Sequence, residues 1–240
     1  MLQKIKHIFS KIIKEDVFPL NYTCSLCDKE VFNGEDFCQK CSSEIYKIEN
    51  RCNHCGRKTP YVVNYCSSCI DKNIDFDFAR SIYDYLGNIP KIIQSFKYNE
   101  KAYLAQIFSK KLKEIYLKEF ITADVIIGVP MTEKAKLKRG YNQSELLAKC
   151  LSREIGVECN FEICKKVKET ERQATLNVLE RAKNLQGAFV VYKKDIVGKN
   201  VLIVDDVLTT GVTVNNIAKL LKKKGANKVF VLTIASVQKD

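Results

Sequence analysis

A thirteen-residue segment, residues 201–213, constrains the fold of this chain more than any other part of its sequence. It opens with four apolar residues, a run typical of a strand covered on both faces of a parallel sheet. Asp205 and Asp206 follow at the carboxyl end of this strand, the edge at which open α/β sheets bind ligands. Hydroxyl and glycine residues then lead into a helix, whose free N–H groups and dipole favour a phosphate: Thr209, Thr210, Gly211 and Thr213. The segment predicts a sugar-phosphate site in an α/β domain.

This segment resembles the phosphoribosyl-pyrophosphate (PRPP) motif of type I phosphoribosyltransferases in its length and in the order of its parts. In that motif an acidic pair holds the ribose 2′- and 3′-hydroxyls and the next loop wraps the 5′-phosphate. The resemblance implies that Asp205 and Asp206 are catalytic residues that orient the ribose. It also implies a phosphate-binding loop of Val207, Leu208, Thr209, Thr210, Gly211, Val212 and Thr213. Each element occurs singly in ordinary turns, but their combination favours a site.

Eight of the eleven cysteines form four Cys-x-x-Cys pairs, and ten residues separate each pair from the next. Two pairs supply the four thiolates of a tetrahedral zinc site, so the sequence predicts two structural Zn²⁺ sites. A disulfide framework is the alternative, which the absence of an export signal disfavours. Sequential pairing is preferred, and a cross-brace that uses the same residues stays open. The ligands are Cys24, Cys27, Cys38, Cys41, Cys52, Cys55, Cys66 and Cys69.

Three other cysteines and one histidine are not expected to bind metal. Cys150, Cys159 and Cys164 have no partner at ligand spacing and are interpreted as ordinary buried cysteines. His54 lies inside a Cys-x-x-Cys pair and is interpreted as a loop residue.

Lysines recur every few positions in residues 1–20, which excludes a signal peptide or a membrane span there. The apolar residues between them trace one face of an amphipathic helix, which packs on the body of the protein or on a partner. We therefore expect a cytoplasmic protein. Its 240 residues, 46% of them hydrophobic, suffice for one α/β core and a small extra module.

The positive charge belongs almost entirely to the second part of the chain. Residues 1–80 contain 12 Lys and Arg against 11 Asp and Glu, whereas the whole chain carries a net charge of +12. Four-thiolate zinc sites would make the first part mildly acidic. The basic part attracts polyphosphates or nucleic acid, or its scattered lysines are simply a solvated surface.

A second candidate site follows the expected buried strand at residues 124–130. The loop after it is basic, and in type I phosphoribosyltransferases the corresponding loop binds pyrophosphate, so the resemblance implies pyrophosphate contacts from Lys138 and Arg139. A helix to about residue 154 and strands at 161–167 and 188–191 come next. The polar residues 169–184 are a candidate lid over PRPP, or a surface loop that contains a helix.

The remaining periodicity agrees with a doubly wound parallel sheet of the type I phosphoribosyltransferase type. It predicts an entry strand at residues 79–85, a helix over 89–118 interrupted near 98–101, a helix from residue 214 that ends at Gly225, and a strand at 228–235. The chain thus divides into an N-terminal helix at 1–20, a small double zinc-ribbon module at 21–72 and a phosphoribosyltransferase-like domain at 78–240.

Taken together, the motifs are similar to those of the ComF competence family. They are the zinc ribbon, Phe96-Lys97-Tyr98, Arg139-Gly140-Tyr141-Asn142-Gln143, Gln173 with Arg181 and Asn184, and the 201–213 segment. Members are phosphoribosyltransferase-like proteins associated with single-stranded DNA uptake alongside a competence helicase, and the superfamily commonly dimerises. Where many members have His-Pro in the pyrophosphate loop, this chain has Thr132-Glu133.

Two functions remain open on the sequence. The first is a phosphoribosyltransferase that binds PRPP with Mg²⁺ and transfers phosphoribosyl to a nitrogen nucleophile with release of pyrophosphate. No base-recognition segment is visible, so the zinc module is a candidate for the hood that selects the acceptor. The second is a non-catalytic accessory factor that handles single-stranded DNA and keeps the PRPP site as a sensor. The closely spaced Phe96, Tyr98 and Tyr103 are its candidate stacking residues.

Overall fold

The computed structural model describes residues 23–32, 34–70, 73–98, 101–169, 187–192 and 196–238. The expected N-terminal helix, nearly all of the candidate lid, and Gln173, Arg181 and Asn184 lie outside these residues. The chain divides into two compact units, Met1–Ile45 and Tyr46–Asp240. The division falls between the two cysteine clusters, so the second cluster belongs to the same unit as the sheet. No helix among the described residues combines the length and hydrophobicity needed to cross a lipid bilayer.

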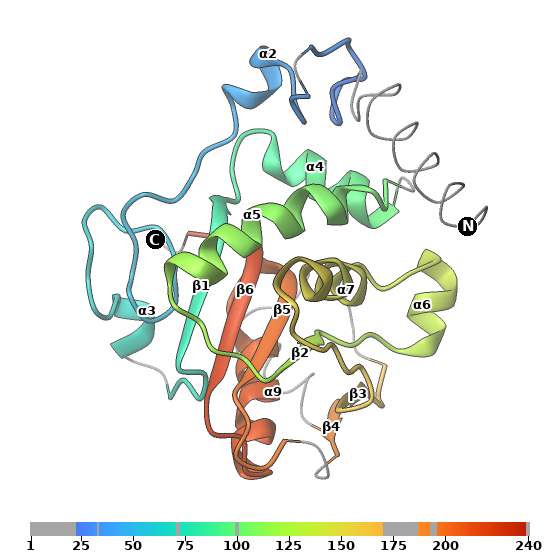
Figure 1. Cartoon of the computed structure of the whole chain (residues 1–240). Helices are drawn as coiled ribbons and strands as arrows, with labels where there is room; N and C mark the ends of the chain where they lie inside the picture. The colour runs from blue at the N-terminus through green and yellow to red at the C-terminus, as the bar shows by residue number, and fades with distance from the viewer. Residues whose placement is uncertain are drawn as a thin grey trace, which may run out of the picture. The chain divides into compact units, whose positions relative to one another are not determined.

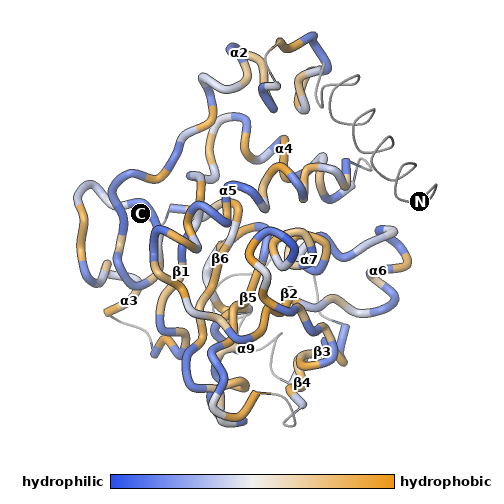
Figure 2. Tube along the Cα trace, in the orientation of Figure 1, coloured by the Kyte–Doolittle hydropathy of each residue, from blue (hydrophilic) through white to orange (hydrophobic). Residues whose placement is uncertain are grey.

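A parallel sheet forms the centre of the second unit. The described residues place four strands in the order β1-β6-β5-β2, with bounds Phe78–Asp84, Val229–Ser236, Val201–Leu208 and Val125–Gly128. Every neighbouring pair is parallel, as the uninterrupted apolar runs predict. Figure 2 shows hydrophobic residues concentrated along these strands.

The strand that carries the acidic pair is longer than expected. The apolar run at 201–204 continues as β5 to Leu208, so that Asp205 and Asp206 lie inside the strand. The neighbouring β6 runs beside them, with Asp205 opposite Thr233 and Leu208 opposite Ser236. The two carboxylates are therefore mounted on a hydrogen-bonded ladder and not on a loop.

Helices cover both faces of the sheet, which confirms the doubly wound fold. Helix α9 (Val212–Lys223) buries Val214, Ile217, Ala218 and Leu221 in one cluster with the odd-numbered side chains of β2 and β5, which share a face because strand side chains alternate. Helices α5 (Leu104–Lys118) and α7 (Gln143–Ile155) pack together and lie in front of the sheet in Figure 1, with α9 behind it. Helix α4 (Ile89–Tyr98) ends at Tyr98 and α5 begins at Leu104, in agreement with the interruption expected near residues 98–101.

One expectation about local structure was wrong, and one pair of expected strands lies apart from the main sheet. The basic segment expected to be a loop contains helix α6 (Glu133–Arg139), which begins because the Thr132 hydroxyl accepts a hydrogen bond from the Ala135 N–H at 3.3 Å. The strands near 164 and 190 do not join the main sheet. They are short, β3 (Cys164–Lys166) and β4 (Phe189–Val191), and form a separate antiparallel pair.

Two short helices each carry the last cysteine of a cysteine cluster, Cys41 and Cys69. Helix α2 (Gln39–Ser42) belongs to the first compact unit and α3 (Ser67–Ile70) to the second. In the second unit, residues 46–48 run antiparallel beside β1, where Ile48 N–H donates to the Ile82 carbonyl at 3.2 Å.

Gly128 allows α7 to approach the end of β2. A Cβ at Gly128 would lie 2.7 Å from the Glu145 backbone nitrogen, inside the first turn of α7. Because backbone cannot move aside as a flexible side chain can, we expect Gly128→Ala to lower the free energy of unfolding by about 3 kcal/mol. Urea denaturation followed by circular dichroism measures this loss. Gly198→Ala is the control: its φ is +74° in open space, so it loses about 1 kcal/mol. Equal losses would contradict the steric explanation.

Candidate functional site

The two carboxylates of the acidic pair have different surroundings. Asp205 Oδ1 accepts hydrogen bonds from the Ser144 hydroxyl at 2.7 Å and from the Asp206 N–H at 2.9 Å. Asp206 Oδ2 accepts from Gln143 Nε2 at 3.2 Å and forms an ion pair with Lys97 Nζ at 2.7 Å. No described residue hydrogen-bonds to Asp205 Oδ2. Asp206 is thus held by the protein, while Asp205 keeps an oxygen for a ligand.

The same surroundings shift the pKa values of Asp205 and Lys97. Burial, and then the neighbouring Asp206 carboxylate, raise the pKa of Asp205 to about 7. Burial opposes the charge on Lys97, but the Asp206 carboxylate outweighs it and the pKa of Lys97 is raised. Lys97 therefore stays protonated, whereas Asp205 titrates near neutral pH in the free protein.

The segment after β5 has the shape of a phosphate-binding turn. Gly211, at φ +79°, takes the left-handed conformation that a non-glycine residue adopts with strain, and α9 begins at the next residue. A cavity of about 390 Å³ lies over this turn. Its lining brings the acidic pair and the predicted phosphate loop together, and consists of Tyr85, Lys97, Asp205, Asp206, Val207, Leu208, Thr209, Gly211, Thr213 and Val214. Thr210 and Val212 are not part of this lining.

A larger and more basic cavity of about 780 Å³ adjoins the first, and both are lined by Lys97, Asp205 and Thr213. Both residues predicted to bind pyrophosphate, Lys138 and Arg139, lie in its wall. Lys134 and Lys166 add two further cations, and Glu169 is the other carboxylate besides Asp205. The excess of positive charge suits a polyanion.

The predicted pyrophosphate residue Arg139 is held by its neighbours. Its Nη1 donates to Gln143 Oε1 at 2.7 Å, its Nη2 donates to the Tyr98 hydroxyl at 3.2 Å, and its guanidinium lies 4.9 Å from the centre of the Tyr98 ring. Thr132, which stands where many ComF proteins have histidine, donates a hydrogen bond to Glu169 and caps α6. These contacts tie the basic helix to α4 and to the start of the region predicted to be a lid.

Sequence reasoning gave no role to the residues that hold the acidic pair. Lys97 and Gln143 were noted only as parts of a family motif, and Ser144 was not noted. The available signal was Asn142, whose side-chain oxygen caps α7 by accepting from the Ser144 N–H at 3.0 Å. A cap at that position places Gln143 and Ser144 in the first turn of a helix that packs on β5.

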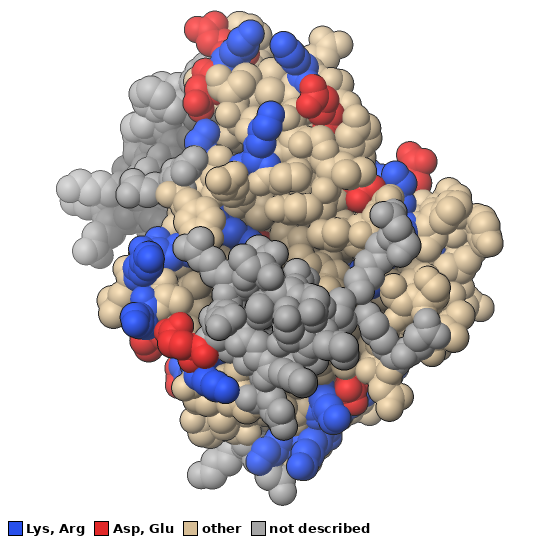
Figure 3. All heavy atoms as spheres, turned by 180° about the vertical axis from the view of Figure 1, so that it is seen from behind, with Lys and Arg blue, Asp and Glu red and all other residues tan. Residues whose placement is uncertain are grey.

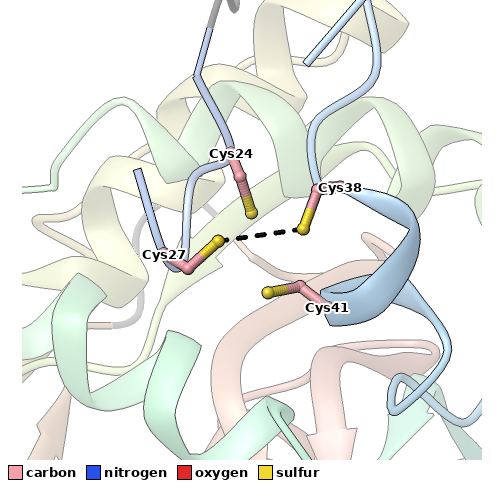
Figure 4. Close-up of side chains that lie close together, drawn as sticks. All are labelled: Cys24, Cys27, Cys38 and Cys41. Atoms are coloured by element: carbon pink, nitrogen blue, oxygen red, sulfur yellow. Dashed lines mark hydrogen bonds between the residues drawn. The ribbon is translucent and has the colours of Figure 1, made fainter. Parts of the chain in front are cut away.

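The cysteines form two four-sulfur clusters with the preferred sequential pairing. Cys24, Cys27, Cys38 and Cys41 make the first, in which all sulfurs point to one centre (Figure 4), and Cys52, Cys55, Cys66 and Cys69 make the second. Neighbouring sulfurs in the clusters lie 3.6 to 3.9 Å apart. A tetrahedron with zinc–sulfur bonds of about 2.3 Å has edges of about 3.8 Å, so both clusters fit Zn²⁺.

One thiol in each cluster favours the thiolate that zinc binding needs. A hydrogen bond from Cys69 lowers the pKa of Cys55 to about 5, against the effect of burial. Burial opposes ionisation of Cys24 as well, but backbone N–H groups, that of Cys38 first, lower its pKa to about 6.

The residues expected to stay outside the metal sites do so. His54 belongs to neither cluster, and its ring stacks on Phe76 at 5.5 Å between centroids. Cys150 and Cys164 are buried as expected, whereas Cys159 is only half-buried, because it lies in the connection between α7 and β3 and not inside an element.

Comparison with known proteins identifies the families that the two parts of the chain match. A family described as "Phosphoribosyl transferase domain" matches residues 97–239, and one described as "Double zinc ribbon domain" matches residues 15–70. The chain is 35% identical over 163 residues to "Competence protein F" of Haemophilus influenzae, an alignment that covers 63% of this chain and 69% of that protein. The chain belongs to the ComF family. Its fold is accordingly of the type I phosphoribosyltransferase type, with a zinc-ribbon region before it.

One further relative carries a name that mentions DNA, and another a name that mentions competence. The chain is 33% identical over 156 residues to "DNA utilization protein YhgH" of Escherichia coli, covering 63% of this chain and 68% of that protein. It is 27% identical over 150 residues to "Competence protein ComFC" of Bacillus subtilis, with 61% and 58% covered. Among solved structures, a purine phosphoribosyltransferase from Pyrococcus horikoshii matches with 19% identity and a TM-score of 0.33, covering 57% of this chain and 82% of that one.

Proposed function

We propose that this ComF protein binds PRPP together with Mg²⁺ and transfers its phosphoribosyl group to a nitrogen nucleophile. The arrangement of Asp205 carries the proposal: a carboxylate oxygen without a described protein partner lies beside a glycine turn at a helix start, where two cavities meet. A ribose fits beside this oxygen, a 5′-phosphate over the turn, and a pyrophosphate in the basic cavity.

The charges of the two cavities match the reaction. The nucleophile's lone pair forms the new bond to the anomeric carbon while the bond from that carbon to pyrophosphate breaks, and pyrophosphate leaves with the electron pair. Lys138 and Arg139 stabilise the negative charge that develops on it, and Lys97 adds a cation between the cavities. Asp205 orients the ribose hydroxyls. When bound, Mg²⁺ would neutralise charge between ribose and pyrophosphate.

Calorimetry of the zinc-loaded protein with PRPP tests the proposal. We expect binding in millimolar Mg²⁺ and at least a tenfold loss when Mg²⁺ is simply omitted, since a chelator would also remove zinc. Absence of binding by the folded, zinc-loaded protein would contradict PRPP recognition. Release of pyrophosphate on addition of nucleobases or other nitrogen acceptors then tests transfer. PRPP binding without pyrophosphate release would leave a sensor and not a transferase.

Lys97→Met is expected to weaken pyrophosphate binding about tenfold or more, because it removes the cation that lines both cavities. Lys136→Met is the matched control. Lys136 lies on α6 but does not line either cavity, and its ammonium pairs with Glu145 at 3.0 Å. Calorimetric titration of both variants with pyrophosphate separates local from general charge effects. Equal losses in the two variants would show that only the overall positive charge matters.

A second function, handling of single-stranded DNA, is favoured by a surface of the second ribbon, which is the segment that carries Cys52, Cys55, Cys66 and Cys69. Tyr61 is 70% exposed and Tyr65 58% exposed, and both line a cavity of about 330 Å³ together with Lys58. Exposed aromatic rings beside cations suit stacked bases. The stacking residues suggested by the sequence are less suitable, because Phe96 is completely buried. In the described part of the face shown in Figure 3, basic side chains lie in separate groups with acidic ones beside several of them.

Fluorescence anisotropy of a labelled single-stranded oligonucleotide tests this second function. We expect affinity that falls as salt rises and a loss of about 2 kcal/mol in the Tyr61→Ala, Tyr65→Ala double variant. Tyr103→Ala is the control, because Tyr103 is 43% exposed but precedes α5, outside the ribbon. Unchanged affinity in the double variant would exclude this ribbon surface as the DNA site.

A further inference from the structure

Arg57 extends from the second cysteine cluster to the phosphate loop. It follows the turn Cys55-Gly56, and its side chain lies in the interior, with only 5% of the residue exposed. Arg57 Nη2 donates a hydrogen bond of 2.6 Å to the Thr209 carbonyl oxygen. The same nitrogen lies 3.6 Å from the position that a Cβ on Gly211 would occupy. Arg57 thus contacts the phosphate loop at the carbonyl group of Thr209 and beside Gly211.

This contact is made outside the lining of the 390 Å³ cavity. Thr209 and Gly211 line the 390 Å³ cavity and Arg57 does not, whereas Arg57 lines the separate cavity of about 330 Å³ beside the second cysteine cluster. A ligand in the phosphate cavity therefore does not touch Arg57. The guanidinium can influence such a ligand through the loop backbone that it holds, and to a smaller extent through its charge.

The cysteine cluster fixes the backbone of Arg57. The Cys52 N–H donates to the Arg57 carbonyl and the Gly56 N–H donates to the Cys52 carbonyl, each at 2.9 Å. Gly56 has φ +69°, and a Cβ there would lie 2.3 Å from the Ala79 carbonyl oxygen of β1. The turn is therefore confined between the sulfurs on one side and the sheet on the other. A metal that holds Cys52 and Cys55 in place also holds the origin of the Arg57 side chain.

We propose that Arg57 is a positioning residue through which metal binding at the second cysteine cluster fixes the conformation of the phosphate loop. Engaging the Thr209 carbonyl keeps this oxygen from the phosphate, which it would repel, and leaves the loop N–H groups to bind it. The ligand part of this inference rests on the proposed PRPP function. The loop part does not, because it concerns the protein without ligand.

Hydrogen exchange in the zinc-loaded, ligand-free protein tests the positioning itself. We expect Arg57→Met to raise the exchange rate of loop amides 209–213 about tenfold. Arg51→Met is the matched control: it removes the same charge from the same ribbon, but Arg51 pairs with Glu119 at 2.5 Å. Arg57→Lys retains the charge and should give a smaller increase, which covers the case in which the methionine variant does not fold. Unchanged exchange in the loop of both Arg57 variants would overturn the proposal.

The affinities for two ligands distinguish a positioning role of Arg57 from general damage to the protein. For Arg57→Met we expect about tenfold weaker binding of ribose 5-phosphate and of PRPP, with pyrophosphate affinity unchanged, because pyrophosphate belongs to the other cavity. Equal losses for ribose 5-phosphate and pyrophosphate would indicate a general defect and overturn the proposal. If the wild-type protein binds none of these ligands, the proposed function fails, and the hydrogen-exchange result still decides whether Arg57 positions the loop.

The coupling to the metal must also work in reverse, because linkage between two sites is reciprocal. Ribose 5-phosphate should slow the release of one of the two zinc ions to a colorimetric chelator about tenfold in the wild-type protein and not in Arg57→Met. Zinc at the first cluster, which belongs to the other compact unit, serves as the internal reference. Equal release rates with and without a ligand that binds would overturn the role of the metal.

Discussion

Asp205→Asn is expected to stabilise the free protein while abolishing Mg²⁺-dependent PRPP binding. Both donors to Asp205, the Ser144 hydroxyl and the Asp206 N–H, bond to Oδ1, so an asparagine carbonyl oxygen can replace it. The substitution removes a buried charge beside Asp206, which we expect to raise the free energy of unfolding by about 1–2 kcal/mol at pH 8. It also removes the carboxylate oxygen available for ribose, for which we expect at least a hundredfold loss of affinity.

The pH dependence of this stabilisation has a defined sign. In the folded protein the pKa of Asp205 is about 7, above the ordinary value of 3.8. Between these values the folded state holds a proton that the unfolded state has lost, so wild-type stability falls as pH rises through this window. The advantage of Asp205→Asn should therefore grow from about pH 4 to pH 7 and stay constant above it. PRPP affinity of the wild-type protein should rise toward pH 7, as the carboxylate ionises.

Asp206→Asn is the matched control, because its surroundings are the opposite. Both oxygens of Asp206 accept from donors: Oδ2 from Lys97 Nζ and Gln143 Nε2, and Oδ1 from the Val207 N–H at 2.7 Å. In either orientation the NH₂ group of an asparagine would therefore face a donor. We expect this variant to lower the free energy of unfolding by about 1–3 kcal/mol. Urea titrations at several pH values measure both variants. Destabilisation by both would show that the two aspartates are structurally equivalent, contrary to their hydrogen bonds.

The second large effect, on thermal stability, is expected from removing a cysteine of the second cluster. Cys52, Cys55 and Cys69 belong to the same buried cluster as Val201, Val231 and the inner face of α9. Loss of zinc from Cys55→Ser would therefore open the core of the whole second unit, and not only a surface ribbon. We expect its main thermal transition to fall by about 10 °C, which corresponds to a loss of about 4 kcal/mol.

Cys27→Ser, in the first cluster, is the control. It removes a ligand of the same kind from the other compact unit, so we expect the transition of the second unit to move by less than about 2 °C. Scanning calorimetry with zinc analysis of each variant makes the comparison. Equal shifts in the two variants would show that the clusters contribute to one cooperative core.

The fold and the metal clusters could be predicted because their signals are local. The segments 124–130 and 201–204 predicted buried parallel strands, and the ten-residue spacing of the cysteine pairs predicted zinc. The choice between sequential and cross-brace pairing needed the structure, because both use the same residues. Helix α6 was missed because its lysines were interpreted as a ligand-binding loop, although Thr132 is a good helix cap.

The contacts that shape the candidate site could not be predicted because they join distant segments. Lys97 meets Asp206 across 109 positions, and Arg57 meets Thr209 across 152. Nothing in the spacing of these residues indicates that they meet, since the topology of the sheet and the docking of the ribbon decide it. The zinc module was considered as a hood that selects the acceptor. This stays a prediction, and the structure brings the second half of the module against the phosphate loop.

The strand order also has a consequence for synthesis of this protein on the ribosome. β6 lies between β1 and β5, yet Phe78 of β1 pairs with Phe230, 152 positions later. When only the residues up to α9 have left the ribosome, β1 and β5 are present but β6, which pairs with both, is not. The unpaired edges of β1 and β5 can then pair with other chains. The second zinc ribbon, complete at Cys69, can bind its metal long before. Sheet closure is therefore a late, single step, and chaperone dependence during translation should concentrate in the interval between β1 and β6.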